Sequence, residues 1–171
     1  MNIVTNTQNW KWVAGIVLLL ALSRLIPHPP NFTPLGAMAI LAGATIKDFR
    51  LALLIPLSAM LASDIFLGFH SSMLFVYASV AIIVLACHFW LKKLSLISLG
   101  LAALFAAILF FLVTNFGAWL SHDMYAHTIG GLGQAYTAGI PFFKNTLLSN
   151  LFFIAISFYA LKTISGKKVF A

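Results

Sequence analysis

The chain has 171 residues, of which 62% are hydrophobic and 8% are charged, and its net charge is +7. Soluble domains carry roughly 25% charged residues, so this composition excludes a water-soluble globular protein and indicates an integral membrane protein. The basic excess does not indicate a nucleic-acid partner, because no soluble basic domain is present to hold one. A single cysteine, Cys87, excludes an internal disulfide and a cysteine-based metal site, and we predict no cofactor.

Six apolar segments are predicted to be membrane helices, since about 20 apolar residues cross the hydrocarbon core. A proline-rich break at residues 27–34 separates the first from the second, because proline cannot continue a helix. A long polar connection is expected at residues 121–144, with a flexible glycine-rich loop at residues 130–133. The predicted helices of this single, all-α transmembrane domain span residues 12–26, 35–46, 51–69, 73–91, 99–120 and 145–164. We expect the first to be retained rather than cleaved as a signal peptide.

The basic residues predict the orientation of these helices. With the N-terminus in the cytoplasm, eight of the ten Lys and Arg residues fall on the inner side, and only Arg24 and Lys144 fall outside. Cytoplasmic loops of membrane proteins carry an excess of Lys and Arg. The sequence therefore predicts that both termini are cytoplasmic.

In this orientation, polar side chains gather near the outer ends of the helices. Polar groups that face lipid stay without hydrogen-bond partners, so polar residues that share a helix face indicate a polar interior. Two such stripes have helical spacing, Asn115–Trp119–His122 and Thr146–Asn150–Ser157. They predict a polar cavity that opens outward.

Asp64 is the only acidic residue inside an apolar segment. A carboxylate within the membrane is costly and marks a functional site by default. The structural alternatives are an ion pair with Arg24, which lies at a similar depth, and a protonated acid bonded to Ser or Asn. We expect Asp64 to face the interior near Arg24. An ion pair between them that organises a binding site would satisfy both the functional and the structural interpretation.

The histidines and Trp119 each have two interpretations. His28 and His70 lie in predicted outer loops and are candidate ligand contacts, although a lone loop histidine is more often solvated. Trp119 is either part of the pocket wall or part of an outer aromatic belt. His122 and His127 are five positions apart, which is a poor spacing for a helical metal site, so we predict none.

Four runs of sequence, at residues 23–44, 56–70, 114–120 and 138–151, carry a family resemblance that extends over nearly the whole chain. The chain resembles small bacterial membrane proteins allied to the substrate-binding S components of energy-coupling-factor vitamin transporters. It is particularly similar to the solitary, BtuM-like cobalamin transporters and their uncharacterised relatives. The proline-rich loop and the stretch SDIFLGFH are the most specific parts of the match.

The resemblance implies a six-helix S-component-like bundle in a bacterial inner membrane, with an outward-facing pocket for a small-molecule ligand. The implied function is uptake of a vitamin-like or other small organic micronutrient, with a corrinoid among the candidates. Positions that match the family's pocket are Arg24, His28, Asn31, Asp64, His70, Tyr77 and Asn115. Trp119 joins them as a candidate because it shares a helix face with Asn115.

Two features depart from the family pattern. Some cobalamin-handling relatives use a cysteine near the outer end of the fourth helix as a cobalt ligand, whereas Cys87 lies deeper than that position. S components that dock a shared energising module have small residues at spacing of four on the first helix, which is mostly bulky here. The lipid bilayer is one predicted partner of the chain. An energising module and a second copy of the chain are two further partners that the sequence leaves open.

The alternative function is a non-transporting membrane scaffold or assembly factor, which would need an exposed interaction surface. The predicted soluble loops are short, so a substrate-binding transporter is the leading prediction. An enzyme is not predicted, because one buried acid with scattered histidines does not supply the usual intramembrane catalytic sets. The chain also has no glycine motif that cradles phosphate.

Overall fold

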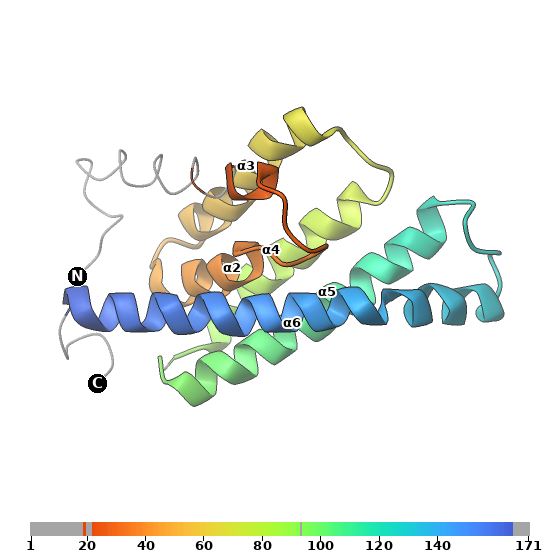
Figure 1. Ribbon diagram of the computed structural model, residues 1–171. Helices are drawn as coiled ribbons and strands as arrows, with labels where there is room; N and C mark the ends of the chain where they lie inside the picture. Colours follow the sequence, from red (N-terminus) through yellow and green to blue (C-terminus); the bar gives the residue numbers. More distant parts are fainter. Residues whose placement is uncertain (1–18, 20–21, 93, 166–171) are drawn as a thin grey trace.

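The computed structural model describes residues 19, 22–92 and 94–165, with side chains as far as Tyr159. Within these residues the chain is all-α and contains no strand, as predicted (Figure 1). Residues 22–25 form the end of a first helical segment, and the rest of the predicted helix 12–26 lies outside the described residues. Five further helices follow: α2 (Leu35–Thr45), α3 (Phe49–Leu67), α4 (Met73–Trp90), α5 (Leu96–Ser121) and α6 (Ile129–Ser165).

Four of these helices, α3, α4, α5 and the part of α6 up to Tyr159, are long and apolar enough to cross a membrane. Their outer surfaces are covered by large apolar side chains, and Phe66, Leu74 and Ile97 are each more than 70% exposed. Water does not tolerate a surface of this kind, whereas lipid solvates it. The chain is therefore a multi-pass membrane protein.

Local capping explains where the helices begin and end. The Asp48 carboxylate accepts a hydrogen bond from the backbone N–H of Arg50 at 2.8 Å, so α3 starts at Phe49, two residues before the prediction. Gly68, with φ of 91°, ends α3 before residue 69. Ser95 and Ser98 form a reciprocal capping box that starts α5 at Leu96 instead of residue 99.

The sixth helix differs most from the prediction. The expected polar connection at residues 121–144 is wrong for most of its length, because α6 begins at Ile129 and continues through the glycines and Pro141. The Thr128 hydroxyl accepts a hydrogen bond from the backbone N–H of Gly131 at 3.1 Å and caps the N-terminus of α6. Each glycine lowers the stability of a helix by about 1 kcal/mol relative to alanine, and packing of α6 along α5 offsets this loss.

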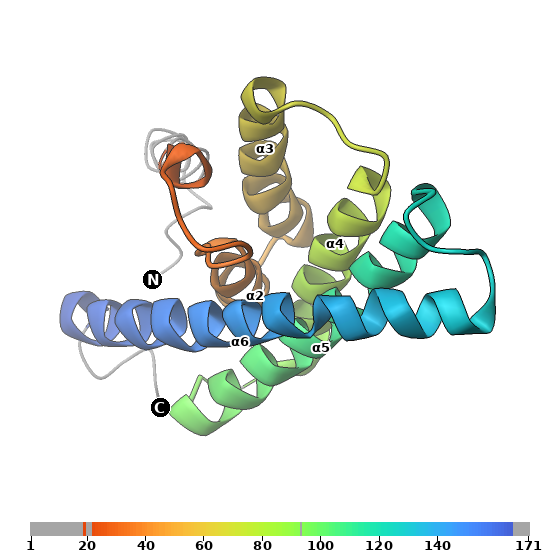
Figure 2. The ribbon, with the colours of Figure 1, turned by 45° about the vertical axis from the view of Figure 1, so that its right-hand side comes forward.

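α2 is short and central. It packs against all four other labelled helices, while α6 crosses it and α5 along the length of the bundle (Figure 1, Figure 2). At 1.5 Å per residue its 11 residues rise about 16 Å, roughly half of the hydrocarbon core. The predicted helix 35–46 therefore exists but is too short to span the membrane alone. Its N-terminus lies inside the bundle, next to the proline-rich segment.

Candidate functional site

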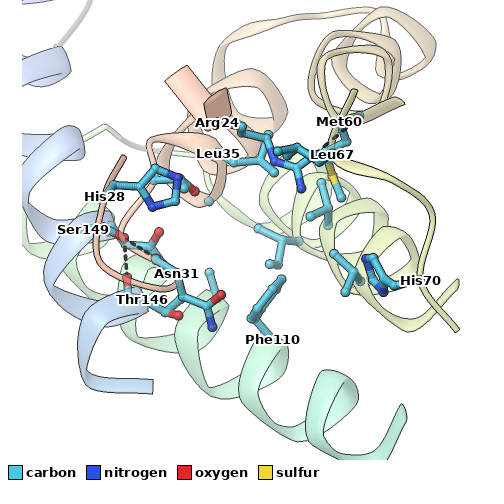
Figure 3. Close-up of a pocket in the computed structure, with 17 residues that line it drawn as sticks. Arg24, His28, Asn31, Leu35, Met60, Leu67, His70, Phe110, Thr146 and Ser149 are labelled. Atoms are coloured by element: carbon cyan, nitrogen blue, oxygen red, sulfur yellow. Dashed lines mark hydrogen bonds between the residues drawn. The ribbon is translucent and has the colours of Figure 1, made fainter. Parts of the chain in front are cut away.

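A cavity of about 310 Å³ lies where the first turn of α2 meets the proline-rich segment and the other four helices (Figure 3). Figure 3 shows His28, Asn31 and Ser149 on one side of this cavity and His70 on the opposite side. Its remaining wall is largely apolar and includes Phe110 and Met60. The polar side chains that line it are Arg24, His28, Asn31, Thr33, His70, Thr146, Ser149 and Asn150.

The proline-rich segment forms one wall because α6 holds it in place. Asn31 has φ of 63°, a left-handed conformation that Asn tolerates and that turns the chain here. The Asn145 amide donates to the carbonyl of Pro30 at 3.0 Å, and the Ser149 hydroxyl donates to the carbonyl of Asn31 at 3.4 Å. The Phe32 ring packs against two phenylalanines of α6. Side chains of α6 thus satisfy and cover the non-helical backbone of this segment, as a membrane protein requires.

Arg24 and Asp64 form an ion pair, which confirms the expectation that Asp64 faces the interior near Arg24. Nη1 of Arg24 lies 2.6 Å from Oδ1 of Asp64 and also donates to the Ser63 hydroxyl and to the carbonyl of Met60. The other oxygen, Oδ2, accepts from the Tyr77 hydroxyl at 2.8 Å. Asp64 is 2% exposed and does not line the cavity, whereas Arg24 does. Asp64 and Tyr77 therefore position the Arg24 guanidinium at the cavity wall.

The charged and titratable groups of the cavity wall are basic. Arg24, His28 and His70 line it, and no acidic side chain among the residues that the structure describes does. Nδ1 of His28 lies 2.9 Å from the carbonyl oxygen of Pro29, which accepts only, so Nδ1 carries the proton and Nε2 is left for other contacts. Nδ1 of His70 lies 3.1 Å from the Ser72 hydroxyl. The wall thus presents N–H donors, which favour a ligand with hydrogen-bond acceptors.

Asn150 lies at the inner end of the cavity, against the first turn of α2. It is 1% exposed, and its Nδ2 lies 3.5 Å from the carbonyl of Ala103. A Cβ atom on Gly36 would lie 2.2 Å from Oδ1 of Asn150, so only glycine permits this approach. Within the described residues, Oδ1 of Asn150 is a buried acceptor with no hydrogen-bond partner.

Asn115 and Trp119 lie elsewhere. Nδ2 of Asn115 donates to the carbonyl of Phe111 at 2.8 Å, and its side chain fills the space beside Gly139 of α6. Nε1 of Trp119 donates to the carbonyl of Ala126 at 2.9 Å. Asn115 thus packs against α6, Trp119 bonds the connection before α6, and neither side chain lines the cavity.

The structure thus brings four of the eight predicted site residues to one cavity and adds others. Thr33, Gly36 and Ser149 line it and were not predicted. Thr146 and Asn150 belong to a predicted polar stripe but were not assigned to the site. The third member of that stripe, Ser157, does not line the cavity. The signal that sequence reasoning could have used is the spacing of Thr146, Ser149 and Asn150 on one helix face.

Potential metal ligands do not converge in the part of the chain that the structure describes. No group of three or more His, Cys, Asp or Glu side chains lies close enough to hold an ion there. Cys87 is buried on α4, where its Cβ would lie 3.0 Å from a Cβ built on Gly43 of α2. It contacts α2 near that helix's other end and does not line the cavity.

The chain belongs to the family described as "Family of unknown function (DUF6580)", whose model matches residues 4–171. No curated protein matches the chain, and no solved structure matches it. The family description assigns no ligand or activity, so any function has to follow from the chemistry of the cavity.

Proposed function

We propose that this member of the DUF6580 family is a substrate-binding membrane protein that takes up a small, vitamin-like organic molecule. The observation that carries the proposal is the cavity of about 310 Å³, where polar side chains from separate segments converge inside an apolar bundle. Such convergence is costly in a membrane unless the polar groups bond one another or bind a ligand.

The size of the cavity supports a compact ligand. Small-molecule pockets measure roughly 300–1,000 Å³, and this one lies at the lower end of that range. A corrin ring with its nucleotide tail is larger than the drug-sized molecules that such pockets hold. The site therefore favours a simpler micronutrient over a corrinoid, in line with the distance of Cys87 from the cavity.

The direction of uptake follows from the basic residues. Lys47 and Arg50 lie in and beside the α2–α3 connection and Lys92 follows α4, at the end of the bundle opposite the N-terminus of α2. If these residues face the cytoplasm of a bacterium, the cavity opens to the outside of the inner membrane. The chain has no phosphate-cradling motif, so an energising module or the ligand gradient would drive net uptake.

The test is to purify the full chain in a mild detergent and identify the small molecules that leave it on denaturation by mass spectrometry. Thr146→Val and Thr137→Val form a matched pair, because each threonine hydroxyl donates to the carbonyl four residues earlier on α6. Only Thr146 lines the cavity. We expect a stoichiometric small molecule with the wild type and Thr137→Val and less of it with Thr146→Val.

Two results would overturn the proposal. One is equal retention of the molecule by both threonine variants, which would place binding outside the cavity. The other is the absence of any small molecule together with a stoichiometric protein partner. That result would favour the alternative, a membrane scaffold or assembly factor.

A further inference from the structure

We propose that the ligand is a compact organic acid with one carboxylate and, at a distance from it, an N–H or O–H donor. This inference rests on the proposed function and specifies the substrate class of the same cavity. Three features carry it: the basic wall, the uncapped N-terminus of α2, and the unpartnered oxygen of Asn150.

The basic wall favours an anion. Within the described residues, the side-chain hydrogen bonds of Arg24 all use Nη1. A guanidinium has five N–H donors, so Nε and Nη2 are left to meet a ligand. His28 and His70 line the same cavity, and none of the described lining residues is acidic. Because Asp64 pairs with the Arg24 guanidinium, the site has little net positive charge, so a singly charged carboxylate held by N–H donors suits it better than a doubly charged phosphate.

The N-terminus of α2 adds a second anion-binding element. The first amides of any helix have no partner within the helix, and its dipole places about half a positive charge there. The N-cap residue of α2 is Pro34, which provides no side-chain hydrogen bond. Leu35 and Gly36, in this first turn, line the cavity. Helices that end within a membrane commonly present such N-termini to anionic substrates.

Asn150 independently indicates a donor on the ligand. A buried amide oxygen without a hydrogen bond costs about 1–3 kcal/mol, so native proteins rarely leave one unpaired. Nδ2 of Asn150 lies 3.5 Å from the carbonyl of Ala103, and Oδ1 lies toward Gly36, a residue that lines the cavity together with Asn150. An N–H or O–H group of the ligand would satisfy this oxygen, whereas a second carboxylate would be repelled by it.

The apolar side chains of the cavity determine the chemistry of the ligand between its carboxylate and its donor. Between the basic wall and Asn150 the cavity is lined by Val80, Ile83 and Phe110 among others. A hydrocarbon chain or a ring between the carboxylate and the donor would contact these side chains and exclude water. Cations and doubly charged anions do not fit a cavity that combines these N–H donors, the N-terminus of α2 and an apolar wall.

The experiment measures the binding of two matched sets of probes to the full chain in detergent, by thermal shift and by calorimetry. One set is 4-hydroxybenzoate, benzoate and 4-hydroxybenzyl alcohol, and the other is 6-hydroxyhexanoate, hexanoate and 1,6-hexanediol. We expect a hydroxy acid to bind roughly 5- to 10-fold more tightly than the matching acid, as one hydrogen bond allows. The matching neutral alcohol should bind more weakly than both.

Two variants locate the effects. Asn150→Leu keeps the side-chain size but removes the acceptor, so the preference for the hydroxy acid should fall to about 1-fold. His70→Gln, at an exposed loop position, should weaken both acids and leave the neutral alcohol unchanged. If Asn150→Leu does not fold, the ratio of hydroxy acid to acid on the wild type decides alone, and a ratio near 1 overturns the inference.

The outcomes separate this inference from the proposed function. A neutral or cationic molecule that co-purifies, or a neutral probe that binds best, overturns the carboxylate class but leaves substrate binding intact. An unchanged hydroxyl preference in Asn150→Leu shows that the ligand hydroxyl bonds a group other than Oδ1 and also overturns the inference. If no probe binds, a co-purified acid with a donor supports the inference, and the absence of any co-purified molecule defeats both proposals.

Discussion

Nη1 of Arg24 lies 2.6 Å from Oδ1 of Asp64, across 40 positions of sequence. The pair joins the segment before the proline-rich loop to the last turn of α3, and Tyr77 on α4 bonds the second carboxylate oxygen. A pair of this kind is weak evidence for stability, because desolvation of both charges offsets their attraction. Removal of one partner is nevertheless costly, since it leaves the other charge buried.

Arg24→Met should therefore destabilise the protein more than the double substitution Arg24→Met/Asp64→Leu. The single change leaves the buried Asp64 carboxylate without its cation, and such changes cost about 3–5 kcal/mol. The double change removes both charges and should recover most of this loss. Reversible unfolding in mixed detergent measures the free energies. A double variant as unstable as the sum of the two single variants would show that the pair is not energetically coupled.

Gly43→Ala should destabilise the protein, and Gly100→Ala should not. A Cβ atom on Gly43 would lie 2.3 Å from the backbone oxygen of Val84, so α2 and α4 would have to separate. Overpacking of this kind costs about 1–3 kcal/mol. Gly100 on α5 has no atom within 4 Å of its Cβ position and serves as the control. Thermal unfolding of the two variants provides the comparison, and equal melting temperatures would contradict the close contact of α2 with α4.

Gly36→Ala should abolish ligand binding while the protein stays folded. The added Cβ would lie 2.2 Å from Oδ1 of Asn150, and it would push that side chain into the cavity. Asn150 is a flexible side chain, unlike the Val84 backbone beside Gly43, so the cost in stability should be the smaller of the two. Retention of the co-purified small molecule reports the effect. Normal retention would show that the inner end of the cavity does not contact the ligand.

The orientation predicted from the basic residues places both termini in the cytoplasm. Reporter fusions after Lys92 and at the C-terminus should report a cytoplasmic location, and a fusion at His70 should report the outside. His70 lines the cavity, so this last fusion also determines the side from which the ligand enters. A C-terminus outside the cytoplasm would reverse the predicted orientation, and the cavity would then open to the cytoplasm.

Sequence reasoning located the ion pair because depth along a helix follows from its fixed rise per residue. It could not assign Asn115, because helical spacing shows which residues share a face but not which neighbouring helix that face meets. Asn115 meets Gly139 of α6 in a segment that was predicted to be a loop. Helix formation at residues 129–144 depends on packing along α5, and residue propensities disfavour it at each glycine.

Asn115→Ala and Ser149→Ala distinguish the predicted site from the observed cavity. The sequence-based hypothesis expects Asn115 to affect binding and assigns no role to Ser149, whereas the structure places Ser149 and not Asn115 at the cavity. Asn115→Ala should leave ligand retention at the wild-type level and lower the unfolding free energy by about 1 kcal/mol, because the Nδ2 bond to Phe111 is lost. Ser149→Ala should reduce retention, because its hydroxyl both lines the cavity and holds the carbonyl of Asn31. Mass spectrometry of the retained molecule and thermal unfolding, performed on the same preparations, separate binding from stability. If Asn115→Ala weakens binding and Ser149→Ala does not, the ligand lies between α5 and α6, and the cavity beside α2 is not the site.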